Sequence, residues 1–475
     1  MIDLKNLTIE KAHESLKQGE FTCRELAEAY LGIIKEKNKE LNAYLEVYDD
    51  VLGQADEAQN KFTAGTDSVL TGIPFAIKDN ILFSGHTASA GSKILGNYRA
   101  TYNATALTEL KKAGVVIIGR TNMDEFAMGS STQTSAYGVS RNPYDTSRVP
   151  GGSSGGSAVA VASDMALVAL GTDTCGSVRQ PSSFCGLVGL KPTYGAVSRH
   201  GIIAMGNSLD QVSPFGKNVR DVEIVFNAMA KYDPADSTSI PENLRQSYAK
   251  GGSASGGKKI GVPWHLFKEG VDEVVMNNFK ESINKLKNNG YEIVDIELPY
   301  SKYSLATYYV IMPAEVSTNL ARFDGIRYGY SSAGENLNEV YTKSRREGFG
   351  REVRRRILLG TYVLSYGYHD AYYNKAVKVR EQIKEEMMKV FEKVDLIATP
   401  TTPTPAFKLG EKLDDPVAMY LCDIFSAPAN LVGVPSIALP SGFTQKGLPL
   451  SIQFMAKHFC EKALFDVGRK FETIG

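Results

Sequence analysis

Two glycine- and serine-rich segments hold the residues of this sequence whose types could do chemistry. The first, residues 151–157, contains Ser153 and Ser154, and the second, residues 171–179, contains Ser177. A serine hydroxyl is a poor nucleophile unless a neighbouring base removes its proton during attack. The two segments are therefore candidates for nucleophilic catalysis, and turns without any chemistry are the alternative interpretation.

The first segment matches two other motifs only in part. Its backbone amides could cradle a phosphate, but the lysine of a P-loop is missing. Gly152, Ser154 and Gly156 match the spacing of a nucleophile elbow, which places its serine directly after a buried strand. The preceding residues 141–150 contain two prolines and predict a loop. Ser154 is therefore not the expected nucleophile.

The elements around these segments are predicted to alternate between helices and strands. An alanine-rich helix candidate, residues 158–166, could return the chain from the first serine segment to the second. Thr22 and Glu25 have the spacing of a capping box, and residues 379–391 keep helical periodicity. Short apolar runs predict strands at residues 73–77, 115–118, 259–262 and 395–400. This alternation indicates an α/β sheet.

Composition limits the classes of protein to consider. The chain has 475 residues, enough for one large domain or two ordinary ones, and 43% are hydrophobic and 22% charged, as in soluble globular proteins. Lys+Arg and Asp+Glu are equal at 53 each, which excludes a strongly basic field over the whole surface. Any contact with RNA is therefore expected to be local or left to a partner.

The cysteines and the apolar segments indicate a reducing compartment. Five cysteines without a C-x-x-C pair argue against a disulfide framework or a zinc site. The first six residues lack the basic start and apolar run expected of a secretory signal, and Asp164 interrupts the apolar stretch 157–170. We expect a soluble, cytoplasmic protein without a membrane span. The glycine/serine run 251–257 is expected to be a mobile surface loop.

Four segments, in this order and spacing, resemble the amidase signature family: residues 77–80, 151–157, 171–174 and 184–193. The resemblance implies one α/β domain over residues 1–475, with a mixed, twisted β-sheet covered by helices on both faces. Its N-terminal helical region would span about residues 1–65, and its signature core about residues 70–215.

The resemblance implies a catalytic role for three residues. Ser177 would be the nucleophile, Ser153 the bridging acid/base and Lys78 the ultimate base. Lys78 must be neutral to act, so its pKa must fall by about three units from roughly 10.4, which burial in an apolar site can supply. In relatives the Gly152–Ser153 peptide is cis. Asp79 is not expected to oppose the pKa shift, since adjacent residues on a strand point to opposite faces.

The loop before Ser177 would stabilise the charge that develops on the substrate's carbonyl oxygen. By resemblance the donors are the main-chain N–H groups of Thr174, Cys175, Gly176 and Ser177, and Asp173 and Arg179 would support the loop. Relatives usually have glycine at position 175, so the Cys175 side chain could restrict the backbone or narrow the pocket. Cys175 is also an alternative nucleophile, which would need a histidine such as His200 nearby in space.

The resemblance extends over nearly the whole chain and is strongest to the A subunits of the amidotransferases that act on glutamyl-tRNA(Gln) or aspartyl-tRNA(Asn). Segments 122–131, 319–325, 347–350 and 355–361 carry it. It implies that Arg356 and Asp423 hold the α-carboxylate and α-ammonium of glutamine, with Tyr308 as a pocket wall. Arg355 and Tyr309 remain alternatives. Most charges in the basic stretch 343–356 are expected to be solvated or to face a partner.

The same resemblance implies a division of labour within an amidotransferase complex. This chain would release ammonia from glutamine and pass it to the B subunit, while a small C subunit supports the assembly. ATP and Mg²⁺ would act only at the partner, which would also bind most of the tRNA, and no metal or cofactor is expected here. The alternatives are a free-standing amidase for other amides and an inactive scaffold.

Overall fold

One mixed β-sheet runs through the molecule. The computed structural model describes residues 2–249 and 258–474, so the run expected to be a surface loop at 251–257 lies outside the described residues. Within them the eleven strands follow the order β1-β3-β2-β4-β6-β5-β10-β11-β9-β7-β8. Their bounds are β1 Tyr44–Val47, β2 Pro74–Lys78, β3 Val116–Thr121, β4 Val168–Asp173, β5 Val188–Lys191, β6 Gln211–Gly216, β7 Lys259–Val262, β8 Glu292–Asp295, β9 Leu396–Pro400, β10 Ser436–Phe443 and β11 Pro449–Ala456.

Parallel and antiparallel pairs both occur in this sheet. Strand β2 is parallel to β3 and β4, and β7 is parallel to β8 and β9, whereas β4–β6, β5–β10 and β10–β11 are antiparallel. Every residue of β2, β3 and β4 is buried. Strands covered on both faces favour continuous apolar runs over alternation, which is why the runs at 73–77 and 115–118 predicted them correctly.

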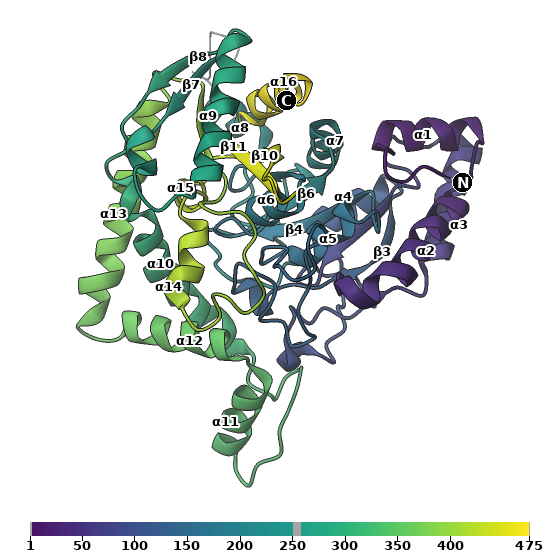
Figure 1. The fold of residues 1–475 in the computed structure, drawn as a ribbon. Helices are drawn as coiled ribbons and strands as arrows, with labels where there is room; N and C mark the ends of the chain where they lie inside the picture. Colours follow the sequence, from purple (N-terminus) through teal and green to yellow (C-terminus); the bar gives the residue numbers. More distant parts are fainter. Residues whose placement is uncertain (1, 250–257, 475) are drawn as a thin grey trace.

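Helices cover both faces of the sheet (Figure 1). Helices α7, α9 and α16 pack against strands and α16 also contacts the other two, while α5 and α6 pack against each other and the sheet centre. None of the helices in the described residues combines the length and apolar composition needed to cross a membrane. The helices are α1 Ile9–Gln18, α2 Cys23–Leu41, α3 Val51–Ala64, α4 Thr105–Lys112, α5 Gly155–Ala162, α6 Arg179–Cys185, α7 Val219–Met229, α8 Glu242–Ala249, α9 Glu273–Asn288, α10 Ser304–Asn319, α11 Leu337–Gly348, α12 Arg351–Leu364, α13 Lys375–Val390, α14 Pro416–Tyr420, α15 Ala427–Val432 and α16 Glu461–Ile474.

The N-terminal region contains three helices and one strand. The predicted capping box is present at the start of α2: Thr22 Oγ1 accepts from Glu25 N at 3.1 Å and Glu25 Oε2 accepts from Thr22 N at 2.8 Å. The short strand β1 interrupts the predicted helical region and pairs antiparallel with β3. Only Tyr44 of its four residues is buried, so the strand left no hydrophobic pattern in the sequence.

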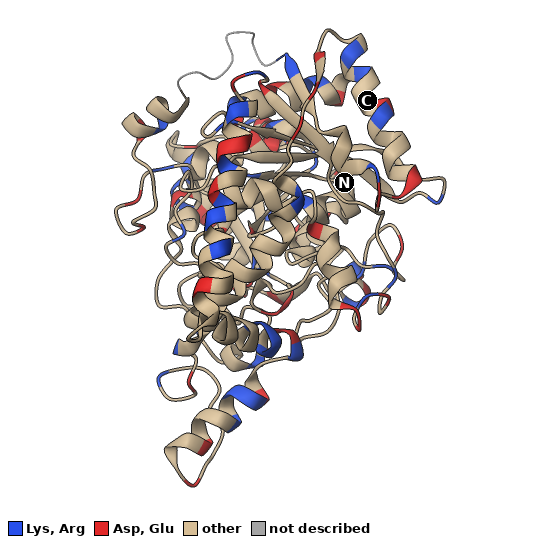
Figure 2. Cartoon of the chain, turned by 90° about the vertical axis from the view of Figure 1, so that its left-hand side faces the viewer, with Lys and Arg blue, Asp and Glu red and all other residues tan. Residues whose placement is uncertain are grey.

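Helices α10, α12, α13 and α15 pack over strands β9 and β11 and form a second apolar core with them. Helix α10 packs against α12 and α13, and α13 against α15. Helix α11 projects away from the main body (Figure 1). Lysines, arginines and acidic residues are interspersed along the helices (Figure 2). Of the seven basic residues in the stretch 343–356 only Arg356 is buried, which confirms that most of these charges are solvated.

Candidate active site

Strand β2 delivers Lys78 to the interior of the protein. Strands β2 and β4 are parallel, so their carboxyl ends meet at one edge of the sheet. Lys78 is fully buried there, and its Nζ donates to Ser153 Oγ at 2.7 Å and to Thr172 Oγ1 at 3.0 Å. The lysine predicted to be the base therefore contacts the serine predicted to relay the proton.

Burial changes the protonation of this lysine. It lowers the pKa of Lys78 to about 7, and the carboxylates of Asp124, Asp210 and Asp173 oppose the change only in part. The neighbouring Asp79 points elsewhere, because its Oδ1 accepts from Arg120 Nη1 at 2.8 Å. The two adjacent side chains thus have separate surroundings, as the alternation of strand residues predicts.

Ser153 lies in a crowded loop directly before α5. The Gly152–Ser153 peptide is cis, as the resemblance implies. A Cβ atom at Gly152 would lie 2.2 Å from an Asp124 carboxylate oxygen, so only glycine fits there. Residues 141–154 contain no strand, and the Ser154 hydroxyl donates to the Thr172 carbonyl at 3.2 Å. The elbow interpretation is therefore excluded, and Ser154 has a structural contact.

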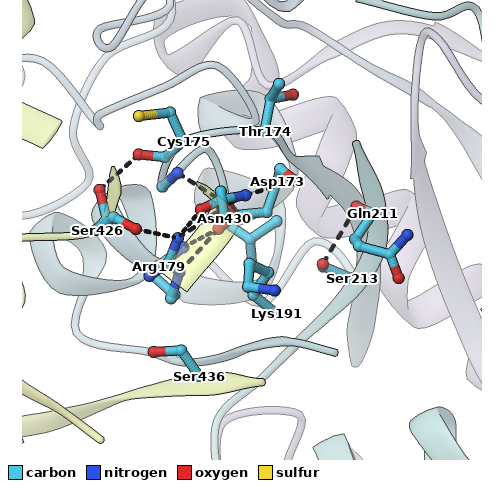
Figure 3. A network of polar contacts seen from close by, with 12 residues as sticks. Asp173, Thr174, Cys175, Arg179, Lys191, Gln211, Ser213, Ser426, Asn430 and Ser436 are labelled. Atoms are coloured by element: carbon cyan, nitrogen blue, oxygen red, sulfur yellow. Dashed lines mark hydrogen bonds and ion pairs between the residues drawn. The ribbon is translucent and has the colours of Figure 1, made fainter. Parts of the chain in front are cut away.

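Ser177 lies in the loop between β4 and α6, and Asp173 organises this loop (Figure 3). The Asp173 carboxylate accepts from Gly176 N at 2.8 Å and Val178 N at 3.2 Å, and it pairs with Arg179 at 3.0 Å. Although burial alone would raise it, the Arg179 guanidinium holds the pKa of Asp173 well below its usual range. A permanent carboxylate at this position fixes the backbone on both sides of Ser177.

The four main-chain amides predicted for the oxyanion hole are not equivalent. The Gly176 N–H donates to Asp173, whereas those of Thr174, Cys175 and Ser177 have no protein acceptor within residues 2–249 and 258–474. The Cys175 carbonyl accepts from Ser426 Oγ at 2.5 Å, which orients the peptide that carries the Gly176 N–H. The other three amides are the ones with free donors for a substrate oxygen.

Cys175 is buried and has no base beside it. Burial, with the Asp423 and Asp173 carboxylates, raises the pKa of its thiol well above the usual value. Each of the six histidines, all of them described, has its polar partner elsewhere; His200, for example, contacts Thr105. The backbone at Cys175 does not adopt the left-handed conformation that favours glycine. A side chain is therefore accommodated at this position, but a cysteine mechanism has no support.

Asp423 lies beside the nucleophile loop, and Arg356 interacts electrostatically with Asp423 and with Cys175 of that loop. Arg356 on α12 is 2% exposed; its Nε donates to Glu352 Oε1 at 2.8 Å. Asp423 follows α14 in a single 3₁₀ turn, Leu421–Asp423, and its Oδ2 accepts from Ser130 Oγ at 2.6 Å. Its other oxygen lies 3.3 Å from where a Cβ of Gly176 would be, so this carboxylate adjoins the nucleophile loop. Burial raises the pKa of Asp423 to about 7.

The alternatives at this end differ in burial and contacts. The Arg355 side chain is 28% exposed and pairs with Glu352, whereas that of Arg356 is 3% exposed. The Arg356 guanidinium lies 5.4 Å from the ring centroids of both Tyr309 and Tyr420, which stack at 3.8 Å. Tyr308 packs edge-on against Tyr309 at 4.9 Å. The Arg356 guanidinium therefore lies near the Tyr309 ring, and Tyr308, the predicted pocket wall, is buried and packs against Tyr309.

A cavity of about 310 Å³ lies beside Arg355 and Arg356, whereas Asp423, Lys78, Ser153 and Ser177 are not among its lining residues. Arg356, Tyr420 and Gly129 are among its lining residues, as is Ser131, the neighbour of the serine that holds Asp423. Such a volume suits a small molecule with a few polar groups.

Several contact residues of the site were not predicted. Thr172, Ser130 and Asn430 each hold a predicted site residue but lie on elements far from it in the sequence. Nothing in the sequence links these pairs. Glu352 is different, because its spacing of four residues from Arg356 on one helix is a recognisable ion-pair signal.

Comparison with known proteins identifies the family. The family model described as Amidase matches residues 25–465. The A subunit of glutamyl-tRNA(Gln) amidotransferase from Thermoanaerobacter pseudethanolicus is 49% identical over 99% of this chain and 97% of its own length. The protein of the same name from Koribacter versatilis is 50% identical over 99% of both chains.

Two solved structures share the fold. The crystal structure of the A subunit of glutamyl-tRNA(Gln) amidotransferase from Thermotoga maritima matches with a TM-score of 0.79 and 40% identity, over 98% of this chain and 94% of that one. Native peptide amidase from Stenotrophomonas maltophilia matches with a TM-score of 0.81 and 28% identity, over 99% of this chain and 97% of that one.

Proposed function

This chain belongs to the amidase family, and on that premise we propose that it hydrolyses the side-chain amide of glutamine as one component of a tRNA-dependent amidotransferase. The ammonia released would convert misacylated Glu-tRNA(Gln), Asp-tRNA(Asn) or both. Near 50% identity over the full length to two proteins named as components of such enzymes supports the proposal.

One observation carries the choice of substrate: a buried guanidinium and a buried carboxylate, those of Arg356 and Asp423, interact electrostatically with each other and with Cys175 of the nucleophile loop. Glutamine carries an α-carboxylate and an α-ammonium, which need a cation and an anion at one end of the pocket. Arg356 is permanently charged and pre-oriented by Glu352 and Tyr309. Asp423 is held by Ser130 beside Gly176. An amidase for simple aliphatic or aryl amides would have no use for such a pair.

The reaction begins with a proton transfer through two serines. Ser177 Oγ attacks the amide carbon of glutamine and passes its proton to Ser153 Oγ, which passes its own proton to neutral Lys78 Nζ. The 2.7 Å separation of Lys78 Nζ and Ser153 Oγ puts the two atoms within reach of a proton transfer, and the lowered pKa of Lys78 supports its role as the acceptor. A hydroxyl can serve as the relay because it both donates and accepts.

Collapse of the tetrahedral intermediate releases ammonia. The free N–H groups of Thr174, Cys175 and Ser177 would stabilise the oxyanion, and Asp173 with Arg179 keeps the loop in place. The protonated relay returns its proton to the departing nitrogen as the C–N bond breaks. Water, deprotonated by the same relay, then hydrolyses the glutamyl ester on Ser177 and restores the enzyme.

The remaining steps belong to other chains of the complex. We infer that a partner equivalent to the B subunit uses ATP and Mg²⁺ to activate the misacylated tRNA and binds most of it, and that a small C subunit supports the assembly. The equal number of acidic and basic residues in this chain fits a limited role in holding tRNA. We expect the complex to work in the cytoplasm, where the five free cysteines stay reduced.

The function is tested by expressing the chain with the candidate partner proteins of its own genome and measuring ammonia release from glutamine. We expect glutaminase activity that Ser177→Ala abolishes, and glutamine-dependent amidation of misacylated tRNA by the complex. Hydrolysis of aryl or aliphatic amides in preference to glutamine would instead identify a free-standing amidase. Amidation with added ammonia but no glutaminase activity would identify an inactive scaffold.

A further inference from the structure

Gln180 occupies a position that the proposed reaction has not used. It is the second residue of α6, three residues after Ser177, and is fully buried. Its backbone N–H donates to the Gly176 carbonyl at 2.8 Å, so its position is tied to the nucleophile loop. Its side-chain amide reaches away from that loop and makes two hydrogen bonds to two different segments.

The first hydrogen bond reaches the loop of the relay serine. Gln180 Oε1 accepts from Gly152 N at 2.8 Å. A Cβ atom at Gly151 would lie 2.5 Å from Gln180 Oε1, so the close approach of this side chain requires glycine there. The N–H that Gln180 holds belongs to the residue directly before Ser153, and Ser153 accepts from Lys78. A displacement of this peptide would therefore move the proton relay.

The second hydrogen bond reaches the segment that holds the carboxylate at the glutamine end. Gln180 Nε2 donates to the Ser130 carbonyl at 2.9 Å. The hydroxyl of the same serine donates to Asp423 Oδ2 at 2.6 Å. A displacement of Ser130 would therefore move or release the carboxylate to which we assign the α-ammonium of glutamine.

We propose that Gln180 is a positioning residue whose acceptor oxygen sets the proton relay and whose donor nitrogen sets the recognition of glutamine. The proposal rests on the glutaminase function proposed above. An amide is the only uncharged side chain of this length that can accept at one atom and donate at the other. Both bonds start from one side chain close to Ser177 in the sequence. They therefore fix the positions of the nucleophile, the proton relay and the substrate pocket relative to one another.

Other hydrogen bonds between the same segments should let variants at Gln180 fold. Thr132 Oγ1 donates to the Gly151 carbonyl at 2.8 Å and accepts from Gly155 N at 3.0 Å. The Asp124 carboxylate accepts from Ser131 N at 3.1 Å and Thr132 N at 2.8 Å. These contacts do not involve Gln180, so the segments should stay together in a Gln180 variant. Loss of the Gln180 hydrogen bonds should change only how the segments are aligned.

Two substitutions separate the two bonds. Gln180→Glu keeps an acceptor for Gly152 N but, when ionised, has no donor for the Ser130 carbonyl. Gln180→Met removes both bonds at similar volume. We expect Gln180→Glu to raise KM for glutamine about tenfold with kcat nearly unchanged, and Gln180→Met to lower kcat as well, with a loss in kcat/KM of about 100-fold, the size expected when catalytic groups are misplaced by about 1 Å.

Steady-state ammonia release from glutamine, measured on the full chain with its partner proteins, tests the proposal. Gln54→Met is the matched control, because Gln54 also bridges two elements, with hydrogen bonds to Ile117 N and O at 3.0 and 3.2 Å, but lies outside the site. A second readout is the pair Gln180→Glu and Ser130→Ala. If Gln180 acts through Ser130, the fold-rise in KM of the double variant is smaller than the product of the fold-rises of the two single variants.

The outcomes are distinct. A rise in KM alone in Gln180→Glu, and a rise in KM with a fall in kcat in Gln180→Met, support the proposal. If Gln180→Met does not fold, the effect of Gln180→Glu on KM but not kcat, and its coupling with Ser130→Ala, decide the outcome. Equal kinetics in the wild type and both variants, or losses that match Gln54→Met and follow the melting temperature alone, overturn it. Absence of glutaminase activity in the wild type would instead overturn the proposed function.

Discussion

The two ends of the site are built in different ways. Lys78, Ser153 and Ser177 come from strand ends and short loops of the central sheet, where main-chain hydrogen bonds and the buried side chains of nearby Asp173 and Gln180 hold the loops. Arg356 and Asp423 come from helix α12 and the turn after α14; Glu352 of the same helix and the ring of Tyr309 hold Arg356, and the distant Ser130 holds Asp423. The first end is a single rigid unit of neighbouring loops, whereas the second is assembled from separate parts.

This difference predicts how substitutions at each end affect catalysis and substrate binding. Groups that pass one proton along a chain must all be in place, so losing any of them stops the reaction. Groups that hold a substrate contribute separately to its affinity, so losing one weakens binding and leaves the chemistry intact. The two ends should therefore respond differently to substitution, pH and denaturation.

The largest expected effect is at the rigid end. Lys78→Met and Ser177→Ala should each lower kcat for glutamine by roughly 10⁴-fold, the size seen when members of a catalytic unit are removed. The double variant should be no worse than Ser177→Ala alone. Single-turnover ammonia release checks this, and losses that multiply in the double variant would show that the two residues do not act as a unit.

The assembled end should show a smaller loss that appears in KM. Arg356→Ala and Asp423→Asn should each raise KM for glutamine by about 10- to 100-fold, the range of one charged hydrogen bond, with kcat within a few-fold of the wild type. Arg355→Ala is the matched control and should change KM by less than about threefold, since its side chain is partly exposed. Steady-state kinetics measures all three. A larger effect for Arg355→Ala than for Arg356→Ala would reverse the assignment.

The slopes of kcat and kcat/KM against pH should show how many groups titrate at each end of the site. Lys78 must be neutral and has a pKa of about 7, so kcat should fall about tenfold per unit as pH drops below that value. Asp423 must be ionised to pair with an ammonium, and its pKa is also about 7. In kcat/KM, which reports the free enzyme, the fall should approach 100-fold per unit.

Asp423→Asn separates the two ionisations. This variant should keep the kcat profile of the wild type while its kcat/KM profile loses the second ionisation. A profile of kcat that did not fall below pH 7 would mean that Lys78 is not the base. Equal slopes for kcat and kcat/KM in the wild type would mean that Asp423 does not titrate in the free enzyme.

The smallest expected effect concerns stability. In the unfolded chain Lys78 binds a proton up to about pH 10.5, but in the folded chain only up to about pH 7. Burial of this lysine therefore destabilises the fold, fully below pH 7 and less and less as pH rises toward 10.5. Lys78→Met should raise the free energy of unfolding near pH 7 by about 1 to 3 kcal/mol after the loss of its hydrogen bonds.

Thermal unfolding at two pH values checks the sign of this effect. The melting temperature of Lys78→Met should exceed that of the wild type near neutral pH, and the gap should shrink near the unfolded-state pKa of lysine. A variant less stable than the wild type at neutral pH would show that the hydrogen bonds of Lys78 outweigh its burial.

The rigid end could be predicted from the sequence because its residues lie in continuous segments. The apolar run before Lys78 predicted a buried strand, the loop before Ser154 excluded an elbow, and the resemblance to amidases covered both serine segments. The bounds of α5 were less well predicted: the helix covers residues 155–162 and ends earlier than expected, because Asp164 adopts a left-handed backbone conformation.

The assembled end could be predicted only in outline. The sequence could not separate Arg355 from Arg356, and burial favours Arg356, because Glu352 pairs with both but the Arg356 side chain is 3% exposed and that of Arg355 28%. The contacts of Ser130 with Asp423, and of Gln180 with Ser130, join residues far apart in the chain. Long-range packing creates such pairs, and no local pattern encodes them.

The measurement that tests the central claim most directly is the position of the covalent intermediate. The complex is quenched with acid during glutamine turnover, and mass spectrometry of its peptides locates any glutamyl ester. We predict an ester on Ser177 that is absent in Ser177→Ala. An adduct on Cys175 or Ser154, or full turnover by Ser177→Ala, would contradict the assignment of Ser177 as the nucleophile.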